Sequence, residues 1–177
     1  NSMNGFNLSD TIDETITSMG SRKLKSWIAF PLIDKKEIKK RQEIVQSIMS
    51  DDEISRLLDI NLNNISDIER LMSKIATYKI SPRELVNLKS SLENVGLIKD
   101  SLLVYSGVLK NYGKSLPNSK SIIGVISKTL KDDSPVSILK GDFIKDGFSK
   151  ELDGLREIRS LGKEYLNQIL ERETKKT

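Results

Sequence analysis

The chain has 177 residues, of which 31% are charged, 37% hydrophobic and only 5% aromatic, and its formal net charge is +4. This length is typical of one domain, and high charge with few aromatics suits elongated helices. Cysteine and histidine are absent, which excludes disulfides, Cys/His zinc sites and Ser-His-Asp triads. The mild basicity permits contact with nucleic acid without demanding it. No apolar run approaches the ~20 residues of a membrane span, and no signal peptide is visible.

The first seven residues are interpreted as a lead-in. The chain opens Asn1-Ser2-Met3, and a methionine at the third position is consistent with an initiator behind added residues. We therefore expect one domain over residues 8–177.

Two short helices are expected first, over residues 8–15 and over residues 18 or 21 to 30. Pro31 ends the second, because proline lacks an N–H and restricts the residue before it. Gly20 lies at the turn between them, where it either adopts positive φ or permits close packing. The shared apolar face of the second helix consists of Leu24, Trp27 and Ile28.

Acidic residues mark the starts of the next two helices. Asp34 and Glu37 resemble a capping box and open a helix that reaches about Ser50. Its expected inner face consists of Ile38, Arg41, Val45, Ile48 and Met49. Asp51-Asp52-Glu53 then places acids where the helix dipole favours them, at the start of a short helix that ends near Asp59.

The middle of the chain carries the clearest helical pattern. Ser66-Asp67 begins a helix to about residue 76, and Ser81-Pro82-Arg83-Glu84 is the strongest start signal. Gly96 is expected to kink or divide the second of these helices, and the pattern resumes over residues 97–112. The stripe of the first helix consists of Ile65, Ile68, Leu71, Met72, Ile75 and Ala76.

A connector over residues 113–119 precedes a helix over 122–130. Residues 142–148 predict a tight turn or small hairpin, with Gly147 at the special position. Ser149 then caps a long final helix that continues to Thr177. Its apolar stripe consists of Leu152, Leu155, Ile158, Leu161, Tyr165 or Leu166, and Ile169. We therefore predict an elongated, all-α fold of about seven or eight helices that ends in a long helix.

Four motifs occur in order along the chain. The first is Thr17-Ser-Met-Gly20-Ser-Arg22-Lys-Leu24-Lys-Ser-Trp27 with Pro31-Leu32, and the second is Ile38-x-x-Arg41-x-x-x-Val45. The third is Ile65-Ser-Asp67-Ile68-Glu-Arg70-Leu71, which Ser81-Pro82-Arg83-Glu84-Leu85 follows. The fourth is Phe143-Ile-Lys-Asp-Gly147-Phe148-x-x-Glu151-Leu152-Asp153-x-Leu155-Arg156. Together they resemble the helical core, or lever, domain of the MutS family of DNA mismatch-repair ATPases.

The resemblance covers nearly the whole chain, although residues 97–140 carry little family signal. In the fourth motif Phe148 replaces the family's usual Tyr and Ser149 its Asp, so no role of the Tyr hydroxyl is carried over. The signature residues are Gly20, Arg22, Trp27, Asp67, Arg70, Gly147, Leu152 and Arg156.

The resemblance implies a domain that begins just inside the family's core and stops where its DNA-gripping clamp would start. The mismatch-reading Phe-x-Glu motif and the ATPase loop Gly-x-x-x-x-Gly-Lys-Ser/Thr are absent from the sequence, so we expect no catalytic, cofactor or metal site here. ATP and Mg would belong to the full-length protein. Its implied partners are double-stranded DNA, the other domains of the chain and a MutS-type dimer partner, with no membrane. We expect a bacterial cytoplasmic location, or a nuclear one if the source is eukaryotic.

The favoured function is thus a non-catalytic lever that couples the ATPase domain to the DNA clamp. The alternative is a free-standing helical protein-interaction module without a role in DNA repair. A basic helical DNA-binding protein ranks below both.

Each signature residue has a functional and a structural interpretation. Gly20 and Arg22 form either a coupling point toward the ATPase domain or, as we favour, a tight turn with an Arg that pairs with a carboxylate. Trp27 is either a partner hot spot or, as we favour, the largest core side chain. Arg172, Lys175 and Lys176 lie where the chain would enter the clamp and are candidates for proximity to DNA.

The charged clusters have structural interpretations too. A basic cluster is expected to be a solvated helix face, because Glu37 and Glu43 interleave with it; it consists of Lys35, Lys36, Lys39, Lys40 and Arg41. Surface or interhelical ion pairs are favoured over acid–base chemistry for Asp67, Glu69 and Arg70. Glu151 and Asp153 are interpreted as helix-dipole partners and not as a metal pair.

Overall fold

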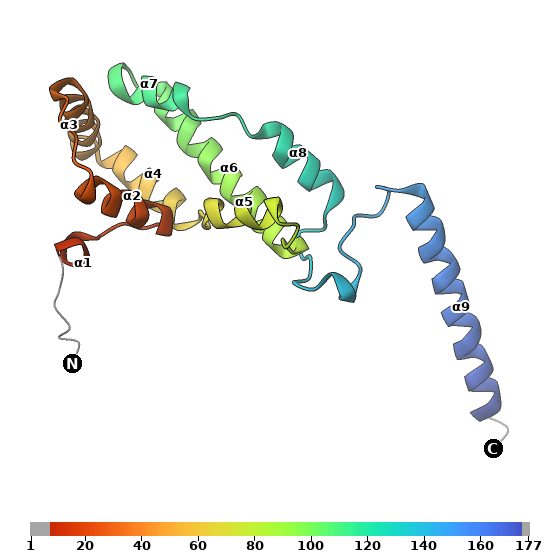
Figure 1. Ribbon diagram of the computed structural model, residues 1–177. Helices are drawn as coiled ribbons and strands as arrows, with labels where there is room; N and C mark the ends of the chain where they lie inside the picture. Colours follow the sequence, from red (N-terminus) through yellow and green to blue (C-terminus); the bar gives the residue numbers. More distant parts are fainter. Residues whose placement is uncertain (1–7, 175–177) are drawn as a thin grey trace, which may run out of the picture.

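The structure is a computed structural model that describes residues 8–174. This range forms the helices α1 (Leu8–Ile12), α2 (Ser18–Ala29), α3 (Lys35–Met49), α4 (Asp52–Asn63), α5 (Ile68–Ala76), α6 (Pro82–Val104), α7 (Gly107–Ser115), α8 (Lys120–Thr129) and α9 (Lys150–Thr174), with a 3-10 turn η1 (Ile138–Lys140) before α9 (Figure 1). Strand pairing among these residues is limited to one antiparallel bridge between Leu130 and Ile144. The predicted all-α class is confirmed.

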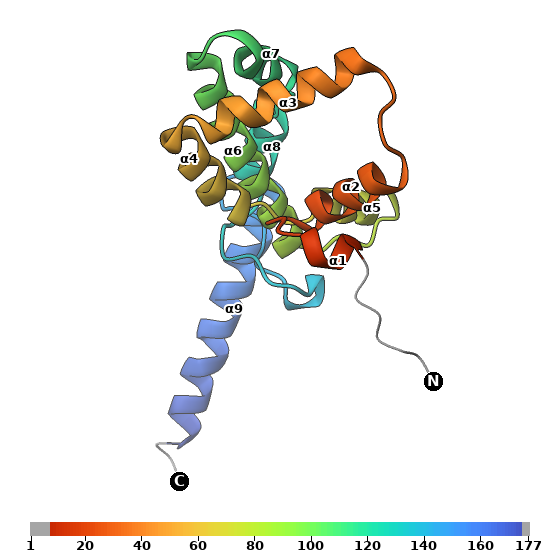
Figure 2. The same cartoon turned by 90° about the vertical axis from the view of Figure 1, so that its left-hand side faces the viewer.

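Helix α6 is the axis of the body, by which we mean α3 to α8. It packs against α4, α5, α7 and α8, while α3 packs against α4 and α7. The buried centre lies where α4, α6 and α7 meet, and it consists of Ile54, Ile98, Leu102 and Leu109. Figure 2 shows α2 beside α5, and α1 packs against α2.

Local start signals place the helices as the sequence predicts. The Ser81 hydroxyl accepts a hydrogen bond from the Glu84 N–H, and the Glu84 carboxylate accepts one from the Ser81 N–H. This reciprocal capping box, with Pro82 in the first turn, fixes the start of α6. At α3 only half of the expected box forms, because Asp34 accepts from the Lys36 N–H.

Helix α6 continues unbroken through Gly96 to Val104, so the expected kink or division at Gly96 is wrong. A glycine inside a helix costs only about 1 kcal/mol, which the surrounding packing outweighs. The break comes at Tyr105 and Ser106, whose backbones are extended, and Gly107 follows with φ of +61°. The predicted helix over 97–112 is therefore divided between α6 and α7.

The end of α4 and the buried face of α3 also differ from expectation. Helix α4 extends to Asn63 and does not end near Asp59. On α3, Val45 and Met49 are exposed, whereas Ile44 and Ile48 pack against the core. Because α3 packs mainly against α4 and α7, its partly buried stripe is narrower than the apolar pattern and is rotated from the predicted face.

Helix α9 leaves the body and projects away from it (Figures 1 and 2). It spans 25 residues, and its apolar stripe is uncovered from Leu155 to Leu166. The exposed fractions run from 59% to 68% for Leu155, Ile158, Leu161, Tyr165 and Leu166. The elongated shape and the long final helix are thus confirmed, while residues 175–177 lie outside the described range.

Candidate functional site

Arg22 on α2 joins the N-terminal helices to α5. Its two terminal nitrogens donate to both carboxylate oxygens of Asp67 at 2.7 and 2.8 Å, and Nε and Nη2 donate to Glu69 Oε2 at 2.9 and 2.6 Å. Asp67 also caps α5 by accepting from the Arg70 N–H at 3.2 Å. We call Arg22, Asp67 and Glu69 the Arg22 clamp.

The electrostatics of the clamp are those of a fixed ion pair. The hydrogen bonds from Arg22 hold the pKa of Asp67 below its ordinary value, and Asp67 and Glu69 raise the pKa of Arg22. An ionised, bidentate pair of this kind positions helices and does not transfer protons near neutral pH. The expected pairing of Arg22 with a carboxylate, and the ion-pair interpretation of Asp67 and Glu69, are confirmed.

Gly20 permits close approach and does not adopt positive φ. It lies in the first turn of α2, where its N–H donates to Thr17 Oγ1 at 3.0 Å. A Cβ at this position would lie 3.1 Å from Thr17 Oγ1 and 3.2 Å from Thr15 Cβ. The glycine therefore lets the preceding loop fold tightly over the start of α2.

Trp27 is not a core residue, so its expected role as the largest core side chain is wrong. It remains 40% exposed, and the Arg41 guanidinium lies 3.8 Å from its ring centroid. This cation–π contact links α2 to α3. Leu24 and Ile28 of the same face are only partly covered, and α2 contains no buried residue.

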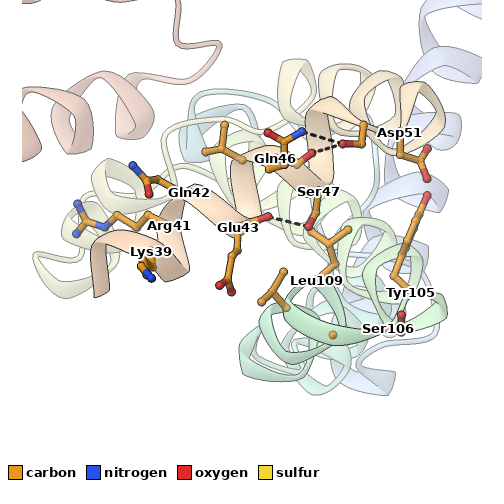
Figure 3. Close-up of a pocket in the computed structure, with 14 residues that line it drawn as sticks. Lys39, Arg41, Gln42, Glu43, Gln46, Ser47, Asp51, Tyr105, Ser106 and Leu109 are labelled. Atoms are coloured by element: carbon orange, nitrogen blue, oxygen red, sulfur yellow. Dashed lines mark hydrogen bonds between the residues drawn. The ribbon is translucent and has the colours of Figure 1, made fainter. Parts of the chain in front are cut away.

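A groove between α3 and α7 has a volume of about 1290 Å³. Figure 3 shows Gln42, Gln46 and Ser47 along one wall and Ser106 and Leu109 on the other. Asp51 and Tyr105 point toward one another at one end. The Ile54 N–H and the Tyr105 hydroxyl lower the pKa of Asp51, while burial and Asp51 raise the pKa of Tyr105. This pair fixes the start of α4 against the α6–α7 turn.

The basic cluster of α3 lies on the outside of that helix. Lys35, Lys36, Lys39 and Lys40 are exposed, and Arg41 is partly covered. Their placement agrees with a solvated face.

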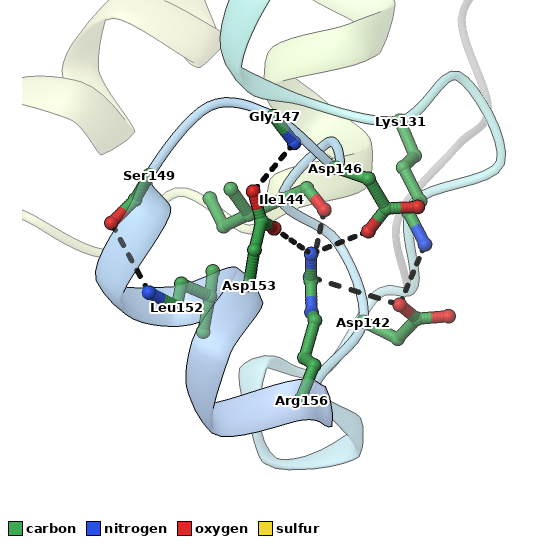
Figure 4. Close-up of polar contacts among 9 residues, drawn as sticks. All are labelled: Lys131, Asp142, Ile144, Asp146, Gly147, Ser149, Leu152, Asp153 and Arg156. Carbon is green, nitrogen blue, oxygen red and sulfur yellow. Dashed lines mark hydrogen bonds and ion pairs between the residues drawn. The ribbon is translucent and has the colours of Figure 1, made fainter. Parts of the chain in front are cut away.

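The guanidinium of Arg156 bonds to several groups of the turn before α9 (Figure 4). Nη1 donates to Asp146 Oδ1 at 2.6 Å and lies 3.5 Å from Asp153 Oδ1. Nη2 donates to the Ile144 carbonyl at 2.8 Å and lies 3.8 Å from Asp142 Oδ1. We call Arg156, Asp142, Asp146 and Asp153 the Arg156 junction.

Gly147 and Ser149 shape the backbone at this junction. Gly147 has φ of +81°, as its special position predicts, and its N–H donates to Asp153 Oδ2 at 2.9 Å. The Leu152 N–H donates to Ser149 Oγ at 3.3 Å, so Ser149 replaces an acidic cap. Asp153 lies in the first turn of α9 together with Glu151, but its carboxylate is engaged by Gly147 and Arg156. The interpretation of these two acids as helix-dipole partners stays a prediction.

Lys131 ties the Arg156 junction to the body, and the sequence analysis missed this contact. Its Nζ donates to Asp142 Oδ1 at 2.6 Å, which raises the pKa of Lys131 and lowers that of Asp142. Asp142 and Asp146 lie two residues before and two residues after Ile144, which pairs with Leu130. This pair of acids around an apolar residue is the sequence signal that could have indicated a partner for a basic side chain.

The remaining predicted site residues are not brought together. Arg70 is exposed on α5 and joins the clamp through its backbone. The side chain of Arg172, together with Lys175 and Lys176, lies outside the described residues. Their proximity to DNA stays a prediction.

The described side chains contain no group of three Asp or Glu residues placed to hold a metal ion. Gly113-Lys114-Ser115 does not form a phosphate-binding loop, because these residues end helix α7. Gly113 is buried, and a Cβ there would lie 2.9 Å from Leu102 Cβ, so it serves helix packing. Among the described helices, none is both long and apolar enough to cross a membrane.

Comparison with known proteins gives the chain a family. The family model for MutS domain III matches residues 1–176. The chain is 42% identical over 175 residues to the DNA mismatch repair protein MutS of Christiangramia forsetii, and 43% identical over 175 residues to that of Flavobacterium johnsoniae. It is 36% identical over 173 residues to that of Thermosipho melanesiensis.

These matches cover 98% of this chain but only 20% of the first two relatives and 21% of the third. The chain therefore spans about one fifth of the length of the curated relatives that it matches. None of these matches supports the alternative of a free-standing interaction module. With the all-α fold and the motifs in place, the chain belongs to the MutS family and corresponds to its domain III.

Proposed function

We propose that this chain is a non-catalytic lever within a longer mismatch-repair protein, where it transmits the nucleotide state of an ATPase domain to a DNA clamp. The observation that carries the proposal is that α9 projects from the body as a long single helix. A straight helix of 25 residues extends about 37 Å, and it starts at a junction of ion pairs on an otherwise packed body. A rigid rod fixed at one end is suited to transmit movement.

The partners of the lever follow from what α9 leaves uncovered. Its stripe of exposed Leu, Ile and Tyr side chains is apolar surface that a soluble monomer rarely leaves open. We propose that other helices of the same full-length chain cover it. Double-stranded DNA and a second MutS-type subunit would be partners of that full-length protein, ATP and Mg its cofactors, and the bacterial cytoplasm its location.

The chain on its own should bind DNA weakly at most. Fluorescence anisotropy with matched and mismatched duplexes is expected to show weak, salt-sensitive binding that ignores the mismatch, and an ATPase assay is expected to show no hydrolysis. A clear preference for the mismatched duplex at physiological salt would contradict the lever function.

A sharper test changes the stiffness of α9 in the full-length protein. Gly162 lies in the middle of α9, with no atom within 4 Å of where a Cβ would stand. Gly162→Pro would kink the helix, whereas Gly162→Ala would stiffen it at the same position. We expect the proline variant to bind ATP but to lose the effect of ATP on DNA affinity, and the alanine variant to keep it. Equal nucleotide dependence in both variants would refute a role for the rod.

A further inference from the structure

Apolar packing does not hold α9 against the body. Between residues 150 and 168, the partly covered residues of α9 are confined to its first two turns, at Leu152, Asp153, Gly154 and Arg156. From residue 157 to residue 168 every side chain is exposed. The direction of the helix must therefore be set near its start.

The segment before α9 belongs to the body. The Lys131 N–H donates to the Phe143 carbonyl and the Lys145 N–H donates to the Thr129 carbonyl, each at 2.9 Å. The Lys145 ammonium adds a bond to the Ser127 carbonyl at 2.8 Å. These contacts fix residues 143–145 to the end of α8.

The end of α8 is in turn fixed to α6. Lys89 on α6 pairs with Asp132 at 2.5 Å, and Arg83 Nε donates to the Ser134 carbonyl at 3.0 Å. Figure 4 shows the side chain of Arg156 reaching from α9 into this fixed turn. Within the described part of α9, its polar contacts with the turn come from Arg156 and Asp153.

We propose that the Arg156 junction is an ionic latch that sets the direction of α9 relative to the body. With the latch closed, the guanidinium bridges the turn at Asp142, Ile144 and Asp146 and the helix at Asp153. When those ion pairs are lost, α9 swings about residues 147–149, where Gly147 already holds positive φ. The inference concerns this chain alone and holds whether or not α9 transmits nucleotide state.

The latch should respond to salt because its two carboxylates in the turn, Asp142 and Asp146, are exposed to water. The side chains of Asp142 and Asp146 are each 76% exposed and that of Arg156 is 27% exposed. Ion pairs between exposed groups are screened as ionic strength rises. The bond to the Ile144 carbonyl and the Gly147–Asp153 bond would persist and act as a loose tether.

The absence of cysteine makes the latch directly measurable. Two cysteines, introduced as Ser121→Cys on α8 and Lys163→Cys on α9, replace exposed residues and can carry spin labels. Pulsed electron paramagnetic resonance then reports the distribution of distances between body and helix. We expect one narrow distance at low salt and the loss of that single distance in Arg156→Gln.

Arg159→Gln is the control for charge without contact. Arg159 is exposed on the next turn of the same helix and acts on Asp142 only through longer-range charge, whereas the ion pairs of the junction are made by Arg156. Arg159→Gln should keep the narrow distance, and 1 M salt should broaden the distribution of the unmutated chain toward that of Arg156→Gln. Asp142→Asn combined with Asp146→Asn should broaden the distribution while leaving Arg156 in place.

An unchanged narrow distance in Arg156→Gln would overturn the latch, as would a broad distance in the unmutated chain at low salt. Circular dichroism separates swinging from unfolding. Retained helicity with a broadened distance supports the latch, whereas loss of helicity in Arg156→Gln would mean that Arg156 only holds the first turn of α9 together.

Discussion

The body and α9 carry the same kind of amphipathic pattern and meet opposite environments. In the body, Ile54 of α4, Leu102 of α6 and Leu109 of α7 converge, and all three are nearly inaccessible to solvent. In α9, the leucines and isoleucines of an equally regular stripe remain largely exposed. The body is thus stabilised by apolar burial, whereas α9 is positioned by charges at one end.

The N-terminal helices resemble α9 in this respect. Helix α2 contains no buried residue, and it is linked to the body by the Arg22 clamp and by the stacking of Arg41 on Trp27. Salt does not screen apolar burial as it screens charges, whereas exposed ion pairs are weak and screened. Both ends of the chain should therefore move more readily than its middle.

The largest loss of stability is expected from a substitution in the buried centre. Ile54 is 1% exposed, and Ile54→Ala should lower the free energy of unfolding by about 2–5 kcal/mol because it leaves a cavity. Ile158→Ala removes the same atoms from the exposed stripe of α9 and should change stability little. Urea denaturation followed by circular dichroism measures both. Similar losses for the two variants would abolish the contrast between body and α9.

The next largest change in stability is expected where α7 packs closely on α6. Gly113→Ala would place a Cβ 2.9 Å from Leu102 Cβ and should destabilise the body by about 1–3 kcal/mol through overpacking. Gly96→Ala meets open space inside α6 and should instead stabilise by about 0.5–1 kcal/mol. Thermal unfolding should shift in opposite directions for the two variants. A gain in stability from Gly113→Ala would show that α6 and α7 separate easily.

A smaller gain is expected after α5. Tyr78 has φ of +54° and is almost fully exposed, and its N–H and that of Lys79 close the end of α5 by bonding to the carbonyls of Ile75 and Lys74. A glycine adopts this conformation without strain, so Tyr78→Gly should stabilise by about 0.5–1 kcal/mol. Tyr78→Ala, which keeps a Cβ, is the control and should show no such gain in denaturation.

Acid should weaken the joint between α5 and α6. The ion pair with Lys74 and the bonds from Ser81 lower the pKa of Glu84 to about 2. Since this folded-state value lies below the unfolded one, the carboxylate stabilises the fold above about pH 4.5 and loses that effect as the pH falls toward 2. The advantage of the unmutated chain over Glu84→Gln, about 1 kcal/mol or less, should shrink over that window. Denaturation curves over a pH series measure this advantage. If the stability difference between the unmutated chain and Glu84→Gln stayed constant over that series, the Glu84 carboxylate would not be its source.

The smallest global effect is expected for the Arg22 clamp. Arg22→Gln removes the bridge from α2 to Asp67 and Glu69, but no buried contact of the body depends on it. Hydrogen exchange over residues 18–29 should accelerate, while the denaturation midpoint stays unchanged. Arg70→Gln, which changes an exposed side chain on α5 and keeps the backbone bond to Asp67, is the control. A large fall in the midpoint for Arg22→Gln would make the clamp part of the core.

Local signals were enough to place most helices, because caps and turns depend on residues three or four positions apart. The Ser81–Glu84 box and the positive φ of Gly147 are read directly from the sequence, and the structure contains both. The break after Tyr105 was missed because extended backbone before Gly107 is imposed by the packing of α7 on α6.

The sequence by itself determined the all-α class, the starts of the main helices, the pairing of Arg22 with a carboxylate and the family. Only the tertiary structure decided which apolar side chains are buried and which charges meet. Trp27 and Val45 are apolar residues in helical stripes, yet Trp27 stays 40% exposed beneath the Arg41 guanidinium and Val45 stays 53% exposed. The Arg22 clamp joins residues 45 and 47 positions apart, and Lys131 reaches Asp142 only because residues 143–145 fold back on α8. Contacts of this range depend on how helices are placed in space, which local propensity does not specify.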